Sequence, residues 1–121
     1  MSKEWAIDKS REIYEKAIHI LPGGASSNIR CNPIYNPHPI FIDRGKGSKM
    51  WDIDGNEYID YLGGMGSLIL GHCHPKIVEA VKKQLERGTI FTTTTELEVE
   101  TGQLFKELVP NAEMVRFVQS G

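Results

Sequence analysis

Hydrophobic residues recur every three or four positions near the start of the chain and again in its second half. Residues 8–20 carry one such stripe, with Asp8 as the candidate N-cap and the turn sequence Pro22–Gly24 behind it. Residues 75–86 carry a second stripe, with a proline in the first turn and Gly88 beyond the end. Both segments predict amphipathic helices.

A third helical stripe leads into a short hydrophobic segment. Thr95 and Glu98 are spaced as in a capping box, and the helix that they open is expected to end before Pro110. Residues 114–119, MVRFVQ, are rich in β-formers and follow this helix, as a buried parallel strand would. Helix, strand and then Ser120–Gly121 indicate an α/β unit that is not finished and whose sheet lies elsewhere.

Between the first two helices the pattern changes to alternation. Hydrophobic residues alternate around Asp54–Gly55, a dipeptide typical of tight turns, which predicts a small antiparallel meander over about 40–61. Residues 25–39 hold three prolines and little periodicity, so they predict an extended loop. The four glycines of residues 63–75 indicate backbone that passes close to another surface.

Composition narrows the class of protein. A chain of 121 residues with 40% hydrophobic content is enough for one small globular core, and at most one domain is expected. The net charge of −2 and the absence of like-charge runs argue against nucleic acid or an anionic membrane as partner. The charged N-terminus and the lack of a long apolar stretch predict a cytoplasmic protein, in which Cys31 and Cys73 stay reduced.

Two short motifs suggest ligands, each with a simpler interpretation. Ser120–Gly121 after a strand would bring backbone N–H groups to an anion, although for two small residues alone an ordinary turn is the favoured explanation. His72, Cys73 and His74 are metal-ligating residue types, but adjacent positions in one short segment do not supply a tetrahedral set. A turn and helix-capping role is therefore favoured for them, and no metal is predicted.

Charged residues offer two further candidates. Arg30 lies in a loop rich in glycine and serine, where it would clamp a carboxylate with two hydrogen bonds, although taken alone a solvated surface role is favoured. The acidic residues around the predicted hairpin would be either paired acid/base carboxylates or solvated, turn-forming residues, and their placement favours the second role. They are Asp52, Asp54, Glu57 and Asp60.

Five stretches in one collinear order resemble the opening of the class III pyridoxal-phosphate aminotransferases, and among them the glutamate-1-semialdehyde 2,1-aminomutases. The resemblance implies an α/β fold, the N-terminal portion of a fold-type I transferase. Residues 1–61 would form the helix, loop and β-meander of its small domain, and residues 62–121 the start of the large cofactor-binding domain. The stretches are LPGGASSNIR, PIFIDRGKGSKMWDIDGNEYIDY, LILGHCHPKIVEAVKKQLERGT, TELEVETGQLFKELVP and VRFVQSG.

The resemblance also implies roles for particular residues. Ser120 and Gly121 match the turn that holds the phosphate of pyridoxal 5'-phosphate in this family. Ser27 and Arg30 match the loop over the active site, with Arg30 placed to pair with the substrate carboxylate. Met65 stands where the aminomutase pattern has a tryptophan of the substrate pocket. The Schiff-base lysine of the family lies beyond residue 121, so no catalytic residue is predicted within this chain.

The implied activity is movement of an amino group on an amino-acid-type substrate, in an enzyme that is a homodimer. The departure at Met65 keeps open a class III transaminase that uses a different amino donor. A truncated, non-catalytic interaction module is the other alternative. The isolated chain of 121 residues is expected to lack transaminase activity.

Overall fold

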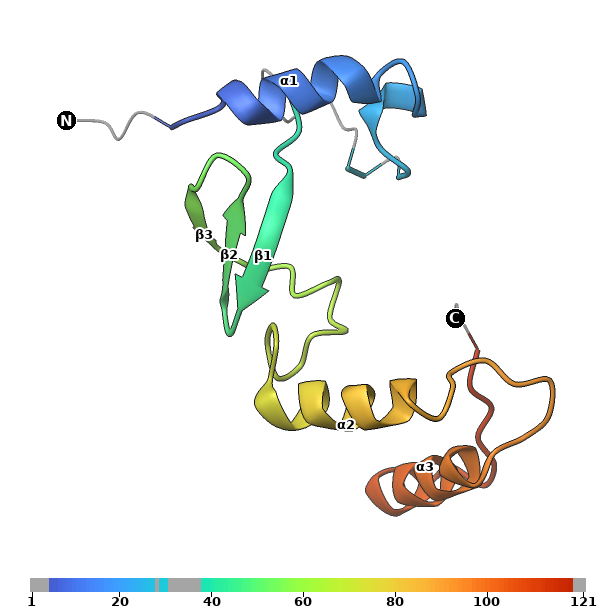
Figure 1. The fold of residues 1–121 in the computed structure, drawn as a ribbon. Coiled ribbons are helices and arrows are strands. Elements are labelled where there is room, and N and C mark those ends of the chain that lie inside the picture. The colour runs from blue at the N-terminus through green and yellow to red at the C-terminus, as the bar shows by residue number, and fades with distance from the viewer. Residues whose placement is uncertain (1–4, 28, 31–37, 119–121) are drawn as a thin grey trace. The chain divides into compact units, whose positions relative to one another are not determined.

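The computed structural model describes residues 5–27, 29–30 and 38–118. The chain forms two compact units, residues 1–79 and 80–121. The family-based domain boundary between residues 61 and 62 stays a prediction. The elements are α1 (Asp8–Ala17), the short 3₁₀ helix η1 (Pro22–Gly24), β1 (Ile42–Lys46), β2 (Lys49–Asp52), β3 (Glu57–Ile59), α2 (Pro75–Leu85) and α3 (Glu96–Leu108), as Figure 1 shows.

The three strands form an antiparallel sheet in the order β1-β2-β3, which confirms the predicted meander. Arg44 of β1 faces Trp51 of β2, and Met50 of β2 faces Tyr58 of β3. The turn between β2 and β3 closes through Gly55, which has a φ of 88° that glycine adopts without steric strain. Tight-turn chemistry at this position therefore sets the register of the hairpin.

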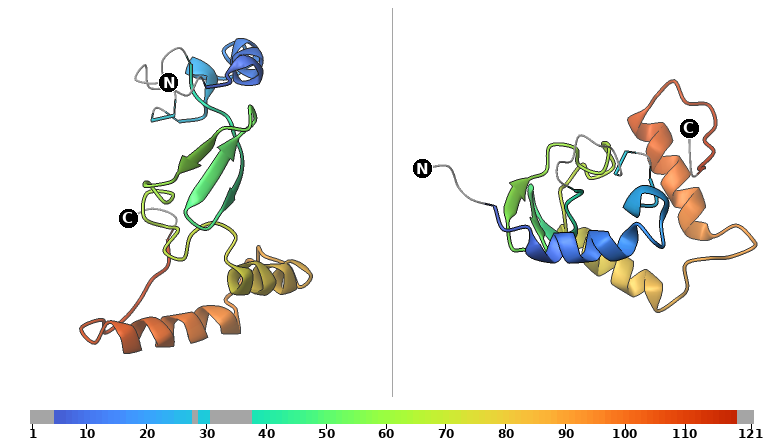
Figure 2. Two further views of the ribbon diagram at one scale, coloured as in Figure 1. Left: turned by 90° about the vertical axis from the view of Figure 1, so that its left-hand side faces the viewer. Right: turned by 90° about the horizontal axis from the view of Figure 1, so that it is seen from above.

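Helix α1 differs from its prediction at both ends. It ends at Ala17, and residues 18–20 form a turn in place of the predicted last helical residues. The N-cap is Ile7, whose side chain makes no capping hydrogen bond, so the prediction of Asp8 as the cap is wrong. The helix N-terminus lies instead beside the β2–β3 turn, as both Figure 1 and the view from above in Figure 2 show. There Asp54 accepts from the backbone N–H of Lys9 at 2.8 Å.

The predictions for the other two helices are confirmed. Helix α2 ends one residue earlier than predicted, and Gly88 behind it has a φ of 96°. Helix α3 begins with the expected cap, in which Thr95 accepts from the backbone N–H of Glu98 at 3.3 Å.

Residues 114–118 form no strand within the part of the chain that the structure describes, so the predicted parallel strand is not found there. A strand requires a hydrogen-bonded neighbour, and the described residues contain only the sheet of β1, β2 and β3. Val115 and Phe117 lie beside α3 instead, where they line a shallow hollow with Val99.

The expectation of one hydrophobic core is also wrong for the described residues. None of their hydrophobic side chains is buried, and the buried side chains are those of the polar residues Ser10, His38, Asp52 and Asn56. The apolar stripe of α2 is open, since Ile77 is 53% exposed. Hydrogen bonds and tight turns therefore organise the described segments. None of the described helices is long and apolar enough to span a membrane.

Candidate functional site

A groove of about 670 Å³ lies in the first unit, between the loop after η1 and the segment that leads into β1. Its walls come from Leu21, residues 24–26, Arg30 and residues 39–42, with Met50 and Leu62. Arg30 is the one charged residue among the described residues that line it. The groove thus combines an apolar surface with a single guanidinium.

Close packing against α1 shapes the loop that carries Arg30. Gly24 is buried with a φ of 80°, and a Cβ at this position would lie 2.7 Å from the ring of Tyr14. The Tyr14 ring also stacks with the ring of His38, at 5.9 Å between centroids. A residue with a side chain at position 24 would therefore clash with the ring of Tyr14.

The groove contains one of the predicted substrate residues. Arg30 lines it, whereas Ser27 is half-buried in the same loop and is not part of the lining. Met65 is 68% exposed and lies in a separate turn after β3. Ser120 and Gly121, the predicted phosphate-binding residues, fall outside the described residues.

The hairpin carries a buried carboxylate that sequence reasoning interpreted as solvated. Asp52 is 2% exposed and accepts hydrogen bonds from the backbone and side chain of Asn56, each at 2.8 Å, and from the Tyr58 hydroxyl at 2.7 Å. Burial acts to raise the pKa of Asp52, but these hydrogen bonds prevail and lower it below its ordinary value. Burial and the same contact with Asp52 raise the pKa of Tyr58 well above its usual range. The solvated interpretation of Asp52 is therefore wrong.

Asp54 ties the hairpin to the start of α1. Its carboxylate accepts from the backbone N–H of Lys9 at 2.8 Å, and from the backbone N–H of Ser10 at 3.0 Å and the Ser10 hydroxyl. Burial acts to raise the pKa of Asp54, but these hydrogen bonds prevail and lower it. Asn56 adds a second tie, since its side chain donates to the carbonyl of Ala6 at 2.6 Å. Local sequence carries no signal for such long-range pairs.

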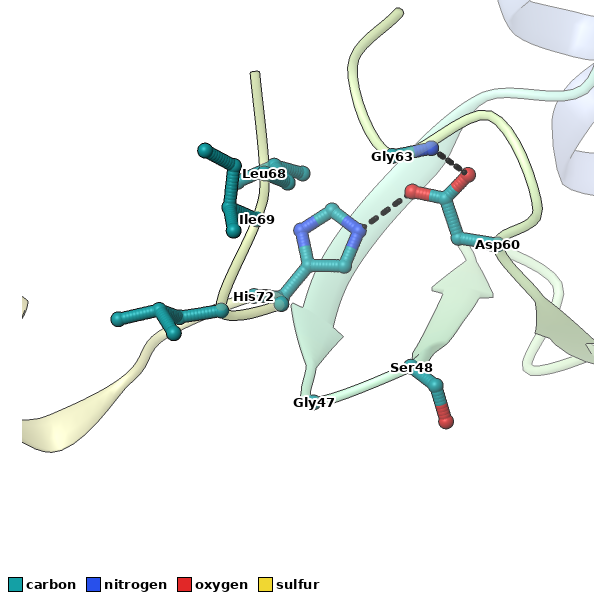
Figure 3. A pocket seen from close by; sticks show the side chains of 9 residues that line it. Gly47, Ser48, Asp60, Gly63, Leu68, Ile69 and His72 are labelled. Atoms are coloured by element: carbon teal, nitrogen blue, oxygen red, sulfur yellow. Dashed lines mark hydrogen bonds and ion pairs between the residues drawn. The ribbon is translucent and has the colours of Figure 1, made fainter. Parts of the chain in front are cut away.

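Asp60 is the third carboxylate of the hairpin region with several hydrogen bonds, and it lines a hollow of about 310 Å³ beside the β1–β2 turn. One carboxylate oxygen lies 2.7 Å from Nε2 of His72, and the other accepts from the backbone N–H of Gly63 at 3.0 Å, as Figure 3 shows. The same oxygen accepts from the backbone N–H of Leu62 at 3.0 Å. The hydrogen bond from His72, followed by that from Gly63, lowers the pKa of Asp60.

The three adjacent residues of metal-ligating type, His72, Cys73 and His74, have different contacts in the structure. His72 is paired with Asp60, and the neighbouring Cys73 is a free, exposed thiol. The carbonyl of His74 accepts the first hydrogen bond of α2, from Val78 at 3.0 Å. Among the described residues no group of three His, Cys, Asp or Glu side chains is placed to hold a metal. The turn and capping role fits these residues.

Comparison with known proteins finds one consistent group. Residues 31–121 match the family described as aminotransferase class-III. The chain is 46% identical over 115 residues to a glutamate-1-semialdehyde 2,1-aminomutase of Archaeoglobus fulgidus, an alignment that covers 95% of this chain and 27% of the relative. The chain therefore spans about a quarter of the length of the curated relatives that it matches.

Two solved structures share the fold of the chain. An omega-transaminase from Sphaerobacter thermophilus superimposes with a TM-score of 0.84 at 37% identity, over 92% of this chain and 25% of that one. A structure described as a transaminase with PLP bound gives a TM-score of 0.89 at 35% identity, over 98% of this chain and 27% of that one. The α/β fold predicted from the sequence, the N-terminal portion of a fold-type I transferase, is confirmed.

Proposed function

Because the chain belongs to the class-III aminotransferase family, we propose that it is the N-terminal part of a pyridoxal-phosphate-dependent enzyme. The enzyme moves an amino group on an amino-acid-type substrate, in the manner of the glutamate-1-semialdehyde aminomutases that the chain resembles. We place it in the cytoplasm as a homodimer. The support is the collinear match over most of the chain and the similarity to a transaminase that carries PLP.

The observation that carries this proposal is Arg30 in its groove. A guanidinium presents two parallel N–H donors that match the two oxygens of a carboxylate, and it keeps its charge at any physiological pH. Arg30 is exposed, so its guanidinium is accessible to a carboxylate that enters the groove. Arg30 binds and orients the substrate carboxylate, and the amino group is thereby directed away from the guanidinium.

The cofactor supplies an electron sink for the carbanion formed at the substrate when it is bound. We assign its phosphate to Ser120 and Gly121, whose small side chains leave backbone N–H groups open to an anion. This assignment rests on the family pattern and the sequence, since both residues lie outside the described part of the chain. We assign Ser27 to the same substrate loop as Arg30.

A class III transaminase with a different amino donor is the second candidate, and Met65 favours it. Where the aminomutase pattern has a rigid aromatic wall, this chain presents a flexible thioether that is 68% exposed. A softer wall of this kind suits a substrate of another shape. The similarity to an omega-transaminase is compatible with both candidates.

The test replaces Arg30 in the complete protein and compares two kinds of amino donor. In Arg30→Ala we expect KM for an amino acid to rise about 100-fold, the effect of losing a two-point, charge-assisted hydrogen bond. KM for a matched amine without a carboxylate should change less than about two-fold. Arg11→Ala is the control, because Arg11 is an exposed arginine of α1, with one guanidinium nitrogen 3.9 Å from a carboxylate oxygen of Asp8. Equal losses with both donors would contradict the assignment.

A further inference from the structure

The turn that carries Met65 has an unusual backbone. Four consecutive residues adopt positive φ angles, with values of 49° at Gly63, 61° at Gly64, 59° at Met65 and 92° at Gly66. Glycine accepts this region freely, but for Met65 it costs about 1 kcal/mol or more. A residue with a side chain stays in such a conformation only when its surroundings fix it.

Hydrogen bonds that fix the turn can be traced back to Asp60. One oxygen of its carboxylate accepts from the backbone N–H groups of Leu62 and Gly63, each at 3.0 Å. The carbonyl of Gly63 then accepts from Gly66 at 3.2 Å and from Leu68 at 2.9 Å. Met65 lies inside this set of bonds, whose first members end on the Asp60 carboxylate.

The second oxygen of Asp60 binds a part of the chain that is itself held rigidly. Nε2 of His72 lies 2.7 Å from it. His72 exchanges two backbone hydrogen bonds with Gly47 at the β1–β2 turn, both at 2.8 Å. The His72 ring also packs so closely on the sheet that a Cβ at Gly45 would lie 2.5 Å from it. Asp60 therefore joins the Met65 turn to a fixed point on the sheet, as Figure 3 shows for Gly63 and His72.

We propose that Asp60 is a positioning residue for the substrate pocket, holding the Met65 turn in place through Leu62, Gly63 and His72. The inference rests on the proposed function, because it takes Met65 as part of the substrate pocket. The Asp60 carboxylate sets where the turn lies and so sets the affinity for the substrate.

The experiment compares Asp60→Ala and Asp60→Asn in the complete holoenzyme. Hydrogen exchange of the peptide covering residues 61–68 is expected to be about 10-fold faster in Asp60→Ala, which lacks the acceptor of both N–H groups. KM for the amino donor should rise about 10-fold with kcat within about two-fold. Asp60→Asn keeps a carbonyl oxygen that accepts from Leu62 and Gly63, so its hydrogen exchange and its KM should stay close to those of the unsubstituted enzyme. Asp43→Ala, on an exposed carboxylate of β1, is the matched control.

Each outcome has one meaning. Faster exchange together with a higher KM supports the proposal. Unchanged exchange in residues 61–68 overturns it, and so does faster exchange with unchanged KM, because the turn would then be loosened without effect on the substrate. If the unsubstituted holoenzyme showed no amino transfer, the proposed function would be refuted instead. The exchange measurement would then still report on the Asp60 contacts alone.

Discussion

Replacing Asp54 by alanine should free the start of α1 from the hairpin. Asp54 lies in the β2–β3 turn, and its carboxylate accepts from the backbone N–H groups at the second and third positions of the helix. These positions are Lys9 and Ser10, whose N–H groups have no carbonyl partner within the helix. Ser10 also donates its hydroxyl to the same carboxylate and is 1% exposed, so water does not replace the lost acceptor easily.

The size of the effect follows from these contacts. Removal of a capping carboxylate costs about 1 kcal/mol, and an unsatisfied buried hydroxyl adds about 1 kcal/mol. We therefore expect Asp54→Ala to lower the free energy of local unfolding of α1 by about 2 kcal/mol, or about 30-fold in the opening equilibrium. Asp54→Asn should lose about half of this free energy, about 1 kcal/mol, because an amide oxygen still accepts from one of the N–H groups.

Hydrogen exchange of the α1 amides in the complete protein measures this opening directly. Asp8→Ala is the informative control, since Asp8 is the carboxylate that local sequence suggests as the cap. Its carboxylate forms an ion pair with Arg11 at 3.9 Å. Its loss should cost about 0.3 kcal/mol through the helix dipole. If Asp8→Ala accelerated exchange as much as Asp54→Ala, or if neither did, the capping role of Asp54 would be refuted.

Two further predictions concern stability. Folding lowers the pKa of Asp52, so the contribution of this carboxylate to stability is present above the ordinary carboxyl pKa of about 3.9. The contribution is lost as the pH falls through the lower pKa of the folded state. In Asp52→Asn, acid titration of the hairpin by NMR should no longer show this loss of stability at low pH, and an unchanged profile would contradict the assignment. A second variant, Gly71→Ala, lies where the segment before His72 contacts the β1–β2 turn. It should lower the free energy of urea unfolding by about 3 kcal/mol. A Cβ at Gly71 would lie 2.7 Å from the carbonyl oxygen of Gly47, and the backbone there has a φ of 78°. Gly47→Ala also has a positive φ but open space around its Cβ, and should cost about 1 kcal/mol; equal losses would argue against the close contact.

Signals that act over a few residues predicted the local structure. The spacing of Thr95 and Glu98 located the start of α3, and the Asp54–Gly55 dipeptide located the turn of the hairpin. These features depend on neighbours within one turn of chain, so the sequence contains all the information that they need.

Contacts between distant segments could not be predicted in this way. Asp54 caps a helix that lies 44 residues earlier in the chain, and Asp60 binds His72 twelve residues later. Alternating acidic residues in a hairpin look solvated until the fold shows which of them meet donors. The strand expected at 114–119 requires a neighbouring strand that the described residues do not contain.

The candidate site was identified only in part. The glycine- and serine-rich loop pointed to Arg30, and the structure places that residue in an apolar groove. The positive φ of Met65 was not predicted, although a run of glycines on both sides of a residue is a signal for left-handed backbone.

The most direct test of the account is the absorption spectrum of the protein expressed from the complete reading frame of the source genome. It is purified with pyridoxal 5'-phosphate and then mixed with an amino-acid donor. We expect the cofactor to stay bound through gel filtration, and its absorption to change to that of the pyridoxamine form when the amino acid is added. A protein that folds but retains no cofactor, or whose bound cofactor does not respond to any amino donor, would contradict the proposed function.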